Sequence, residues 1–124
     1  MKLIEVTNLK AFYEAVKDQT LPLKTSYKLA MLSRNIEQEL NFYQTKFREI
    51  ILEYCEKDEN GNPLTTEDGA GIKLRAGTEM ECTEKVRELQ ELEIDFPETK
   101  FSIDEFEGVN LTIDQLKTGL VLFE

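Results

Sequence analysis

A long, uninterrupted amphipathic pattern is the feature that most constrains how this chain can fold. From Thr25 to Glu56, apolar residues recur three or four positions apart, and no glycine or proline interrupts them. The apolar positions are Leu29, Leu32, Ile36, Leu40, Tyr43, Phe47, Ile50 and Tyr54. This spacing predicts one α-helix with a continuous apolar face. At 1.5 Å per residue the helix would be about 48 Å long, longer than a globule of this size is wide.

The long helix is predicted to have a second apolar surface. Phe42 and Ile51 lie off the main stripe, on other sides of the helix. In a small protein, a long helix with two apolar faces favours self-association. We therefore expect a homo-oligomer that forms through the long helix.

Shorter helical patterns lie on both sides of this helix. Residues 9–16 carry one apolar face behind a capping residue, Thr7 or Asn8, and Pro22 separates them from the long helix. Thr78 is the expected cap of a third helix that ends near Leu89. Its inward residues are predicted to be Cys82, Val86 and Leu89.

The hydrophobic period changes to two after the third helix. Leu92, Ile94 and Phe96 alternate with acidic residues, which predicts a half-buried strand, and a turn leads into a second strand from Phe101. Two capping-box sequences follow, at 102–105 and 112–115. The predicted fold class is α+β: a long central helix, shorter packed helices and a small antiparallel β-sheet. We expect one domain, 1–124, with a helical part (1–57) and an acidic α+β part (58–124).

Charge and composition limit the classes of function. Histidine and tryptophan are absent, which removes Ser-His-Asp and Cys-His catalysis and every zinc site that needs histidine. The net charge is −10, and residues 58–124 hold six Lys/Arg against 17 Asp/Glu. This acidity opposes direct binding to a DNA backbone.

The cysteines and the N-terminus indicate the compartment. Cys55 and Cys82 are too few for a disulfide framework and lack metal-ligand spacing, so each is expected to be a small buried apolar side chain. The N-terminal residues lack the apolar region of a signal peptide, and no apolar run is long enough to cross a bilayer. We therefore expect a cytoplasmic protein with no membrane partner.

No motif predicts a catalytic centre, a metal site or a cofactor, so we expect a protein that is not an enzyme. The turn that begins at Asp58 resembles the first half of an EF-hand loop. However, Pro63 and Gly69 stand where such a loop needs its glycine and its bidentate glutamate. We interpret this segment as a turn in which Gly61 supplies a positive φ.

The start of the long helix is a candidate anion site. Two cations and three hydroxyls there accompany the free N–H groups of the first turn, a combination typical of phosphate or carboxylate binding. The alternative is an ordinary solvated helix start. The candidate residues are Lys24, Thr25, Ser26, Tyr27 and Lys28.

A set of carboxylates in the second half of the chain is a candidate partner-binding surface. Such a set is either a solvated face or an electronegative patch that docks a host protein with a basic surface. The candidate residues are Glu93, Asp95, Asp104, Glu105 and Glu107.

Several cap and turn segments resemble those of one family of proteins. They are Leu21-Pro22, Lys24, the stretch from Ser26 to Leu29, and the sequence from Glu56 to Asn62. Together with the long helix, they resemble small uncharacterised acidic proteins encoded by phages and prophages of Gram-positive bacteria. The resemblance implies the cytoplasm of an infected bacterium as the setting, and it implies no functional residue. The stretch from Thr65 to Gly77 departs from the short acidic loop of that family, and the sequence assigns no role to residues 65–77.

Three hypotheses follow. The first is a non-enzymatic phage accessory protein that binds and inhibits a host protein of antiviral defence. The second is an oligomer that sequesters a small anionic ligand, such as a nucleotide signal. The third is a structural or assembly role in the virion.

Overall fold

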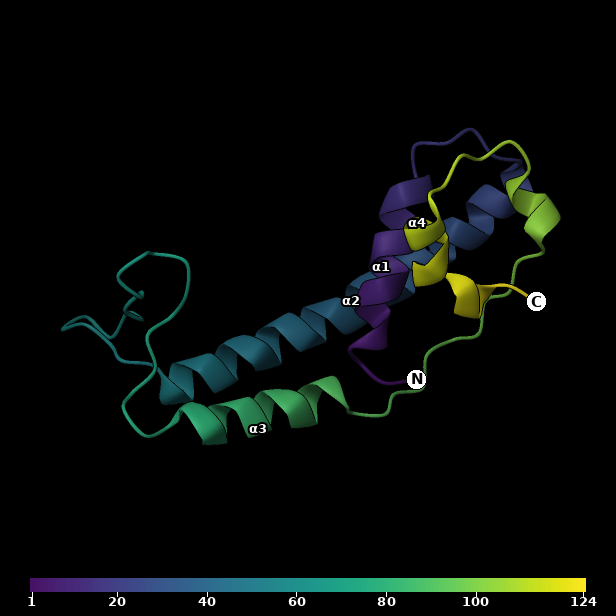
Figure 1. Ribbon diagram of the computed structural model, residues 1–124. Helices are drawn as coiled ribbons and strands as arrows, with labels where there is room; N and C mark the ends of the chain where they lie inside the picture. Colours follow the sequence, from purple (N-terminus) through teal and green to yellow (C-terminus); the bar gives the residue numbers. More distant parts are fainter.

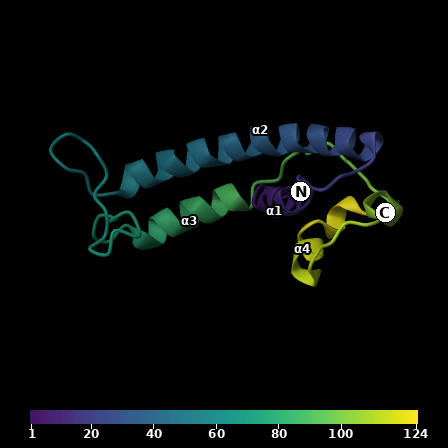
Figure 2. The same cartoon turned by 90° about the horizontal axis from the view of Figure 1, so that it is seen from above.

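The computed structural model describes residues 1–124, and Figure 1 shows an elongated molecule with a head at one end and an arm at the other. The head comprises α1, the first half of α2 and residues 91–124. The arm comprises the second half of α2, the tip loop (residues 55–78) and α3, and Figure 2 shows it extending away from the head. The helical elements are α1 (Glu5–Val16), α2 (Leu23–Tyr54), α3 (Glu79–Gln90), η1 (Ile103–Phe106), α4 (Ile113–Thr118) and η2 (Leu120–Leu122).

The hydrophobic core lies in the head. Phe12 of α1 is fully buried and makes edge-to-face contacts with Phe106 and Phe123, with ring centroids 5.7 and 5.9 Å away. The last residue of α2 in this core is Ile36; beyond it, only Tyr54 of α2 is buried. The single long helix predicted from the sequence is therefore confirmed, but its apolar stripe enters the core only along its first half.

In the arm, α3 packs along the second half of α2 (Figure 2). Cys82 and Leu89 are buried, as the sequence predicts. Gln90 Nε2 donates a hydrogen bond to the Tyr43 hydroxyl at 3.2 Å. This two-helix layer is thinner than the head, so its apolar side chains remain partly exposed.

The tip loop is folded back on itself. Three isolated antiparallel bridges hold it, and one of them joins Cys55 to Leu74. The Asp58 carboxylate accepts hydrogen bonds from the backbone N–H groups of Asn60 and Asn62, and Gly61 has φ +81°. The predicted turn is confirmed. Cys55 is buried, as predicted, and both cysteines are free thiols.

The predicted antiparallel sheet is absent, so the α+β prediction is wrong. The chain is 56% helical, and the 8% in strands or bridges forms no sheet because every bridge is isolated. Residues 92–96 are extended, but a single bridge joins Glu93 to Lys2. This pairing ends because the chain enters α1 at Glu5 and no longer offers an extended partner.

The second predicted strand also makes only one pairing. An isolated parallel bridge joins Phe101 to Phe123, and η1 begins two residues after Phe101. The alternating pattern reflects an extended segment that crosses the head. Ile94 and Phe96 pack against the core, while Leu92 is 43% exposed. The apolar residues of this alternating segment therefore pack on the surface of the head and do not belong to a strand of a sheet.

Helix boundaries differ from the predictions at the N-terminus. Helix α1 begins at Glu5, so Thr7 and Asn8 lie within the helix rather than at its cap. Val6 in this additional turn and Leu3 just before it are both completely buried, and the Glu5 carboxylate accepts the Lys2 backbone N–H at 3.0 Å. None of the helices combines the length and the apolar composition that crossing a bilayer requires.

Candidate functional site

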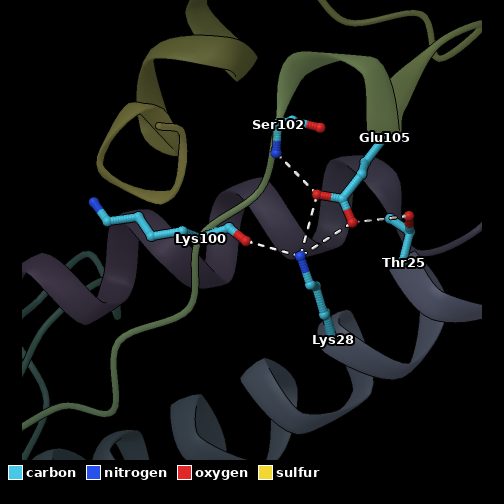
Figure 3. A network of polar contacts seen from close by, with 5 residues as sticks. All are labelled: Thr25, Lys28, Lys100, Ser102 and Glu105. Carbon is cyan, nitrogen blue, oxygen red and sulfur yellow. Dashed lines mark hydrogen bonds and ion pairs between the residues drawn. The ribbon is translucent and has the colours of Figure 1, made fainter.

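The two sequence-predicted binding surfaces meet at one place, which we call the clasp (Figure 3). Lys28 of α2 and Glu105 of η1 are 77 residues apart in sequence, and Lys28 Nζ donates to the two Glu105 carboxylate oxygens at 3.1 and 3.2 Å. The same Nζ donates to the Lys100 carbonyl oxygen at 3.0 Å. Thr25, which is fully buried, also directs its hydroxyl to Glu105 Oε1 at 3.5 Å.

The local sequence of η1 positions the carboxylate. Ser102 and Glu105 form the predicted capping box, in which Glu105 Oε2 accepts the Ser102 backbone N–H at 2.8 Å. The same Glu105 carboxylate therefore caps the first turn of η1 and forms the ion pair with Lys28 of α2. The Lys28 ammonium also lies 5.2 Å from the centre of the Phe101 ring, within the range of a cation–π contact.

The electrostatics of the clasp favour the ionised carboxylate. The hydrogen bond from the Ser102 backbone N–H, supported by the Lys28 ammonium, lowers the pKa of Glu105 below its ordinary value, although partial burial opposes this shift. The side chains of Lys28 and Glu105 are 29% and 19% exposed. The pair is thus shielded from water more than any other side-chain ion pair of the protein.

The clasp changes how the candidate anion site must be understood. Lys28 and Thr25 contact a carboxylate of the chain itself, at the helix start where we expected an external anion. Lys24, Ser26 and Tyr27 remain exposed, and Lys24 lines a depression of about 480 Å³ beside the clasp. Binding of a ligand anion there stays a prediction, because such an anion would have to compete with Glu105 or bind beside it.

The candidate carboxylates fall into two separate places. Glu93 and Asp95 follow α3, beside the N-terminus, and the Met1 ammonium pairs with Glu93 at 3.2 Å. Asp104 and Glu107 are exposed at η1, near the start of α2, and Figures 1 and 2 both show η1 apart from the end of α3. Glu105 is the member engaged in the clasp. The five residues do not form one continuous patch.

Helix α3 adds carboxylates that the sequence analysis did not include among its candidates. Residues 84, 88 and 91 are spaced by four and three positions, which places them on one side of the helix. All three are exposed, and two further exposed carboxylates, Glu93 and Asp95, follow in the segment after the helix. We call this line of carboxylates the acidic row; it consists of Glu84, Glu88, Glu91, Glu93 and Asp95. The helical spacing was visible in the sequence and would have identified it.

Two members of the acidic row have a cationic neighbour. Arg87 pairs with Glu84, and the N-terminal ammonium pairs with Glu93, whose side chain is still 72% exposed. Glu88, Glu91 and Asp95 make no ion pair. They are the charges of the row that remain available to a partner.

Comparisons with known proteins give no relative from which a role could be transferred. The chain matches no protein-family model, and neither a curated protein nor a solved structure is significantly similar to it. No group of three or more Cys, Asp or Glu side chains is arranged to hold a metal ion. The surfaces of the chain are therefore what indicate its function.

Proposed function

We propose that this chain is a non-enzymatic protein that binds another protein at a basic surface and blocks it. The observation that supports this proposal is the acidic row along α3 and the segment that follows it. A basic surface that normally binds nucleic acid or a nucleotide presents lysine and arginine side chains to a line of phosphates. The row offers such a surface a line of carboxylates instead.

The spacing of the row suits this role. Glu88 lies in the last turn of α3 and Glu91 caps the C-terminus of this helix, and side chains three positions apart on a helix lie roughly 5–6 Å from each other. One DNA strand carries a negative charge about every 3.4 Å of axis, so the row is sparser but of the same order. Positive side chains are flexible enough to pair with either spacing.

The packing of α3 also supports this proposal. Cys82 and Leu89 are buried against α2, so the opposite side of α3 is held in place before any partner binds. Pre-organised charges lose less conformational entropy on binding than charges on a loop. Complementary charge also raises the association rate and disfavours acidic partners.

We also propose that the chain acts inside an infected bacterium. The resemblance to phage proteins favours a bacterial host protein, and in particular a component of antiviral defence, as the partner. We expect inhibition by occupation of the basic surface, because the chain offers no catalytic arrangement for changing its partner chemically.

The test starts with affinity capture of the tagged protein from bacterial lysate, followed by a binding measurement with the purified partner. The row variant Glu88→Gln/Glu91→Gln/Asp95→Asn removes three charges that make no ion pair. Exposed ion pairs contribute about 0.2–1 kcal/mol each, so we expect the row variant to bind roughly tenfold more weakly. Nucleic acid or nucleotide that binds the partner should compete with the wild-type chain.

A matched control removes the same charge elsewhere. Glu59, Glu67 and Glu124 are exposed and make no ion pair, and their triple glutamine variant should bind within about twofold of wild type. Equal weakening by both variants would show an effect of net charge alone and would contradict the proposal. An Asp104→Asn/Glu107→Gln variant tests the η1 carboxylates, and Glu105 is left intact because its loss would disturb the clasp.

A further inference from the structure

An apolar groove lies at the far end of the arm. It is lined by Phe47, Ile51 and Leu52 of α2 and by Pro63 and Ile72 of the tip loop, and its volume is about 420 Å³. Phe47 and Ile72 are 37% and 39% exposed. An apolar cavity of roughly 150 Å³ already holds a benzene molecule, so this groove has room for a large aliphatic side chain.

One charged residue, Arg48, also lines the groove. It is exposed and makes no ion pair or hydrogen bond through its guanidinium group. Arginine binds carboxylates through a planar pair of donors. The groove therefore suits a segment in which an exposed aliphatic residue is followed directly by a carboxylate.

The chain itself presents such a segment at the start of α4. Ile113 is the first residue of this helix and is 78% exposed, and Asp114 follows it. Thr112 and Gln115 form a capping box that fixes the turn, with the Gln115 backbone N–H donating to Thr112 Oγ1 at 3.1 Å. Asp114 is exposed and makes no ion pair, not even with Lys117 one turn further along.

A second isoleucine–aspartate pair is less suited to this contact. Ile103 is 66% exposed, and Asp104 lines the depression beside the clasp together with Lys24 and Lys28. Asp104 makes no ion pair, but it shares this depression with two lysines of its own chain, and its isoleucine is the less exposed of the two. The segment at the start of α4 offers the more exposed isoleucine, and its carboxylate lies outside that lysine-lined depression.

The groove and the start of α4 cannot meet within one molecule. Helix α4 belongs to the head, whereas the groove lies at the end of α2 beside the tip loop, and Figures 1 and 2 both show the length of the arm between them. We propose that the groove docks a second copy of this chain, which inserts Ile113 and places Asp114 against Arg48. Because the two surfaces differ, the contact is heterologous and builds a ring or a filament.

Net charge opposes this contact and sets the conditions for measuring it. Each copy carries a net charge of −10, but at about 0.15 M salt charges further apart than roughly 8 Å are largely screened. The association is therefore measured by sedimentation velocity in 150 mM NaCl over a series of protein concentrations. The proposal predicts species larger than a dimer as the concentration rises.

A charge exchange tests the polar half of the contact. Arg48→Asp and Asp114→Arg should each weaken association at least tenfold, and the double variant should recover most of it. Arg34→Asp is the matched control, because Arg34 is also an exposed arginine of α2 without an ion pair, and it should associate as wild type does. These residues make no contact that the fold needs, so the variants should retain wild-type circular dichroism.

A mixing experiment tests the apolar half. Ile113→Asp lacks the inserted residue but keeps its groove, whereas Ile72→Asp keeps the inserted residue but damages its groove. Each should be monomeric alone, and a mixture of the two should form a 1:1 heterodimer that grows no further.

Several results would overturn the proposal. These are a wild-type chain that stays monomeric up to about 0.5 mM, a charge exchange without recovery, or an Ile103→Ser variant that weakens association as much as Ile113→Ser does. If Ile72→Asp fails to fold, the charge exchange decides alone. None of these substitutions touches the acidic row, so this inference and the proposed function stand or fall separately.

Discussion

Gly119 lies against the ring of Phe12 so closely that a side chain at this position would overlap the ring. A Cβ on Gly119 would lie inside the van der Waals distance of three ring carbons. Phe12 cannot easily move, because it is fully buried and contacts the rings of Phe106 and Phe123. Gly119 directly follows the last residue of α4, Thr118, so this close approach lies at the C-terminal end of that helix.

The contact predicts a large effect for a small substitution. Gly119→Ala should lower the free energy of unfolding by about 2 kcal/mol, because overpacking a core costs roughly 1–3 kcal/mol. Urea denaturation followed by circular dichroism measures it. Gly71→Ala is the control, since a Cβ there meets only the Thr66 side chain at 3.9 Å, and it should change stability by less than about 0.5 kcal/mol. Equal effects at both glycines would contradict the packing argument.

The clasp predicts that charge and hydrogen bonding at Glu105 can be separated. Glu105→Gln keeps an oxygen that accepts the Ser102 N–H but loses the ionic bond to Lys28, so we expect a loss of about 1 kcal/mol. Glu105→Ala loses both and should cost about 2 kcal/mol.

A double-mutant cycle of Lys28→Met with Glu105→Gln measures the coupling between the two charges, which should be about 1 kcal/mol. The same cycle on Lys46 and Glu49, whose side chains are 47% and 59% exposed, should give less than about 0.5 kcal/mol. A coupling near zero for the clasp would contradict a stabilising role.

The lowered pKa of Glu105 predicts a specific acid response. Its folded-state pKa lies below the ordinary value of 4.5, so its contribution to stability is fully present above that pH and is lost as pH falls through the folded-state pKa. The stability difference between wild type and Glu105→Gln should therefore be constant from pH 7 to about pH 5.5 and shrink toward pH 3. Urea denaturation across this range measures it. A difference that grows on acidification would have the wrong sign.

The thin arm predicts that it opens without unfolding of the head. No α2 residue between Ile36 and Tyr54 is buried, so fewer buried apolar side chains stabilise the arm than stabilise the head, although α3 is packed on α2 in the native state. In a Cys55→Ser background, we expect Cys82 to react with a thiol reagent faster than global unfolding allows. Cys82 is buried, so a reagent reaches its sulfur only when the arm opens, and burial also raises the pKa of the thiol, which slows its reaction in the closed state.

The head variant Gly119→Ala provides the matching test. It should lower global stability while leaving the labelling rate of Cys82 nearly unchanged. A rate that rises in proportion to the loss of global stability would show that head and arm unfold as one unit.

Local sequence patterns were sufficient to predict most of the helices. The helical period of the long stripe predicted α2 to within two residues at each end, and the two capping boxes formed where their sequences occur. The stripe did not reveal that α2 leaves the core after Ile36. Periodicity records which side of a helix is apolar, but it does not record how many layers of protein cover that side.

Pairings between distant segments could not be predicted in this way. Lys28 was predicted as part of the anion site and Glu105 as part of the partner-binding surface. Nothing in their local spacing indicates that η1 docks on α2 and brings the two together. The prediction of an antiparallel sheet was wrong for the same reason. An alternating segment requires a partner strand, and here the candidate partners turn into α1 and η1 after one bridge.

The unbroken course of α2 makes the arm a lever. No glycine or proline interrupts the helix between the core at Ile36 and its end at Tyr54, a rise of about 27 Å. A tilt of about 10° where α2 leaves the core would move the tip by roughly 5 Å. A small rearrangement of the head therefore produces a larger displacement of the tip loop. A molecule bound at the end of the arm is coupled through α2 to the packing of a core that it does not contact.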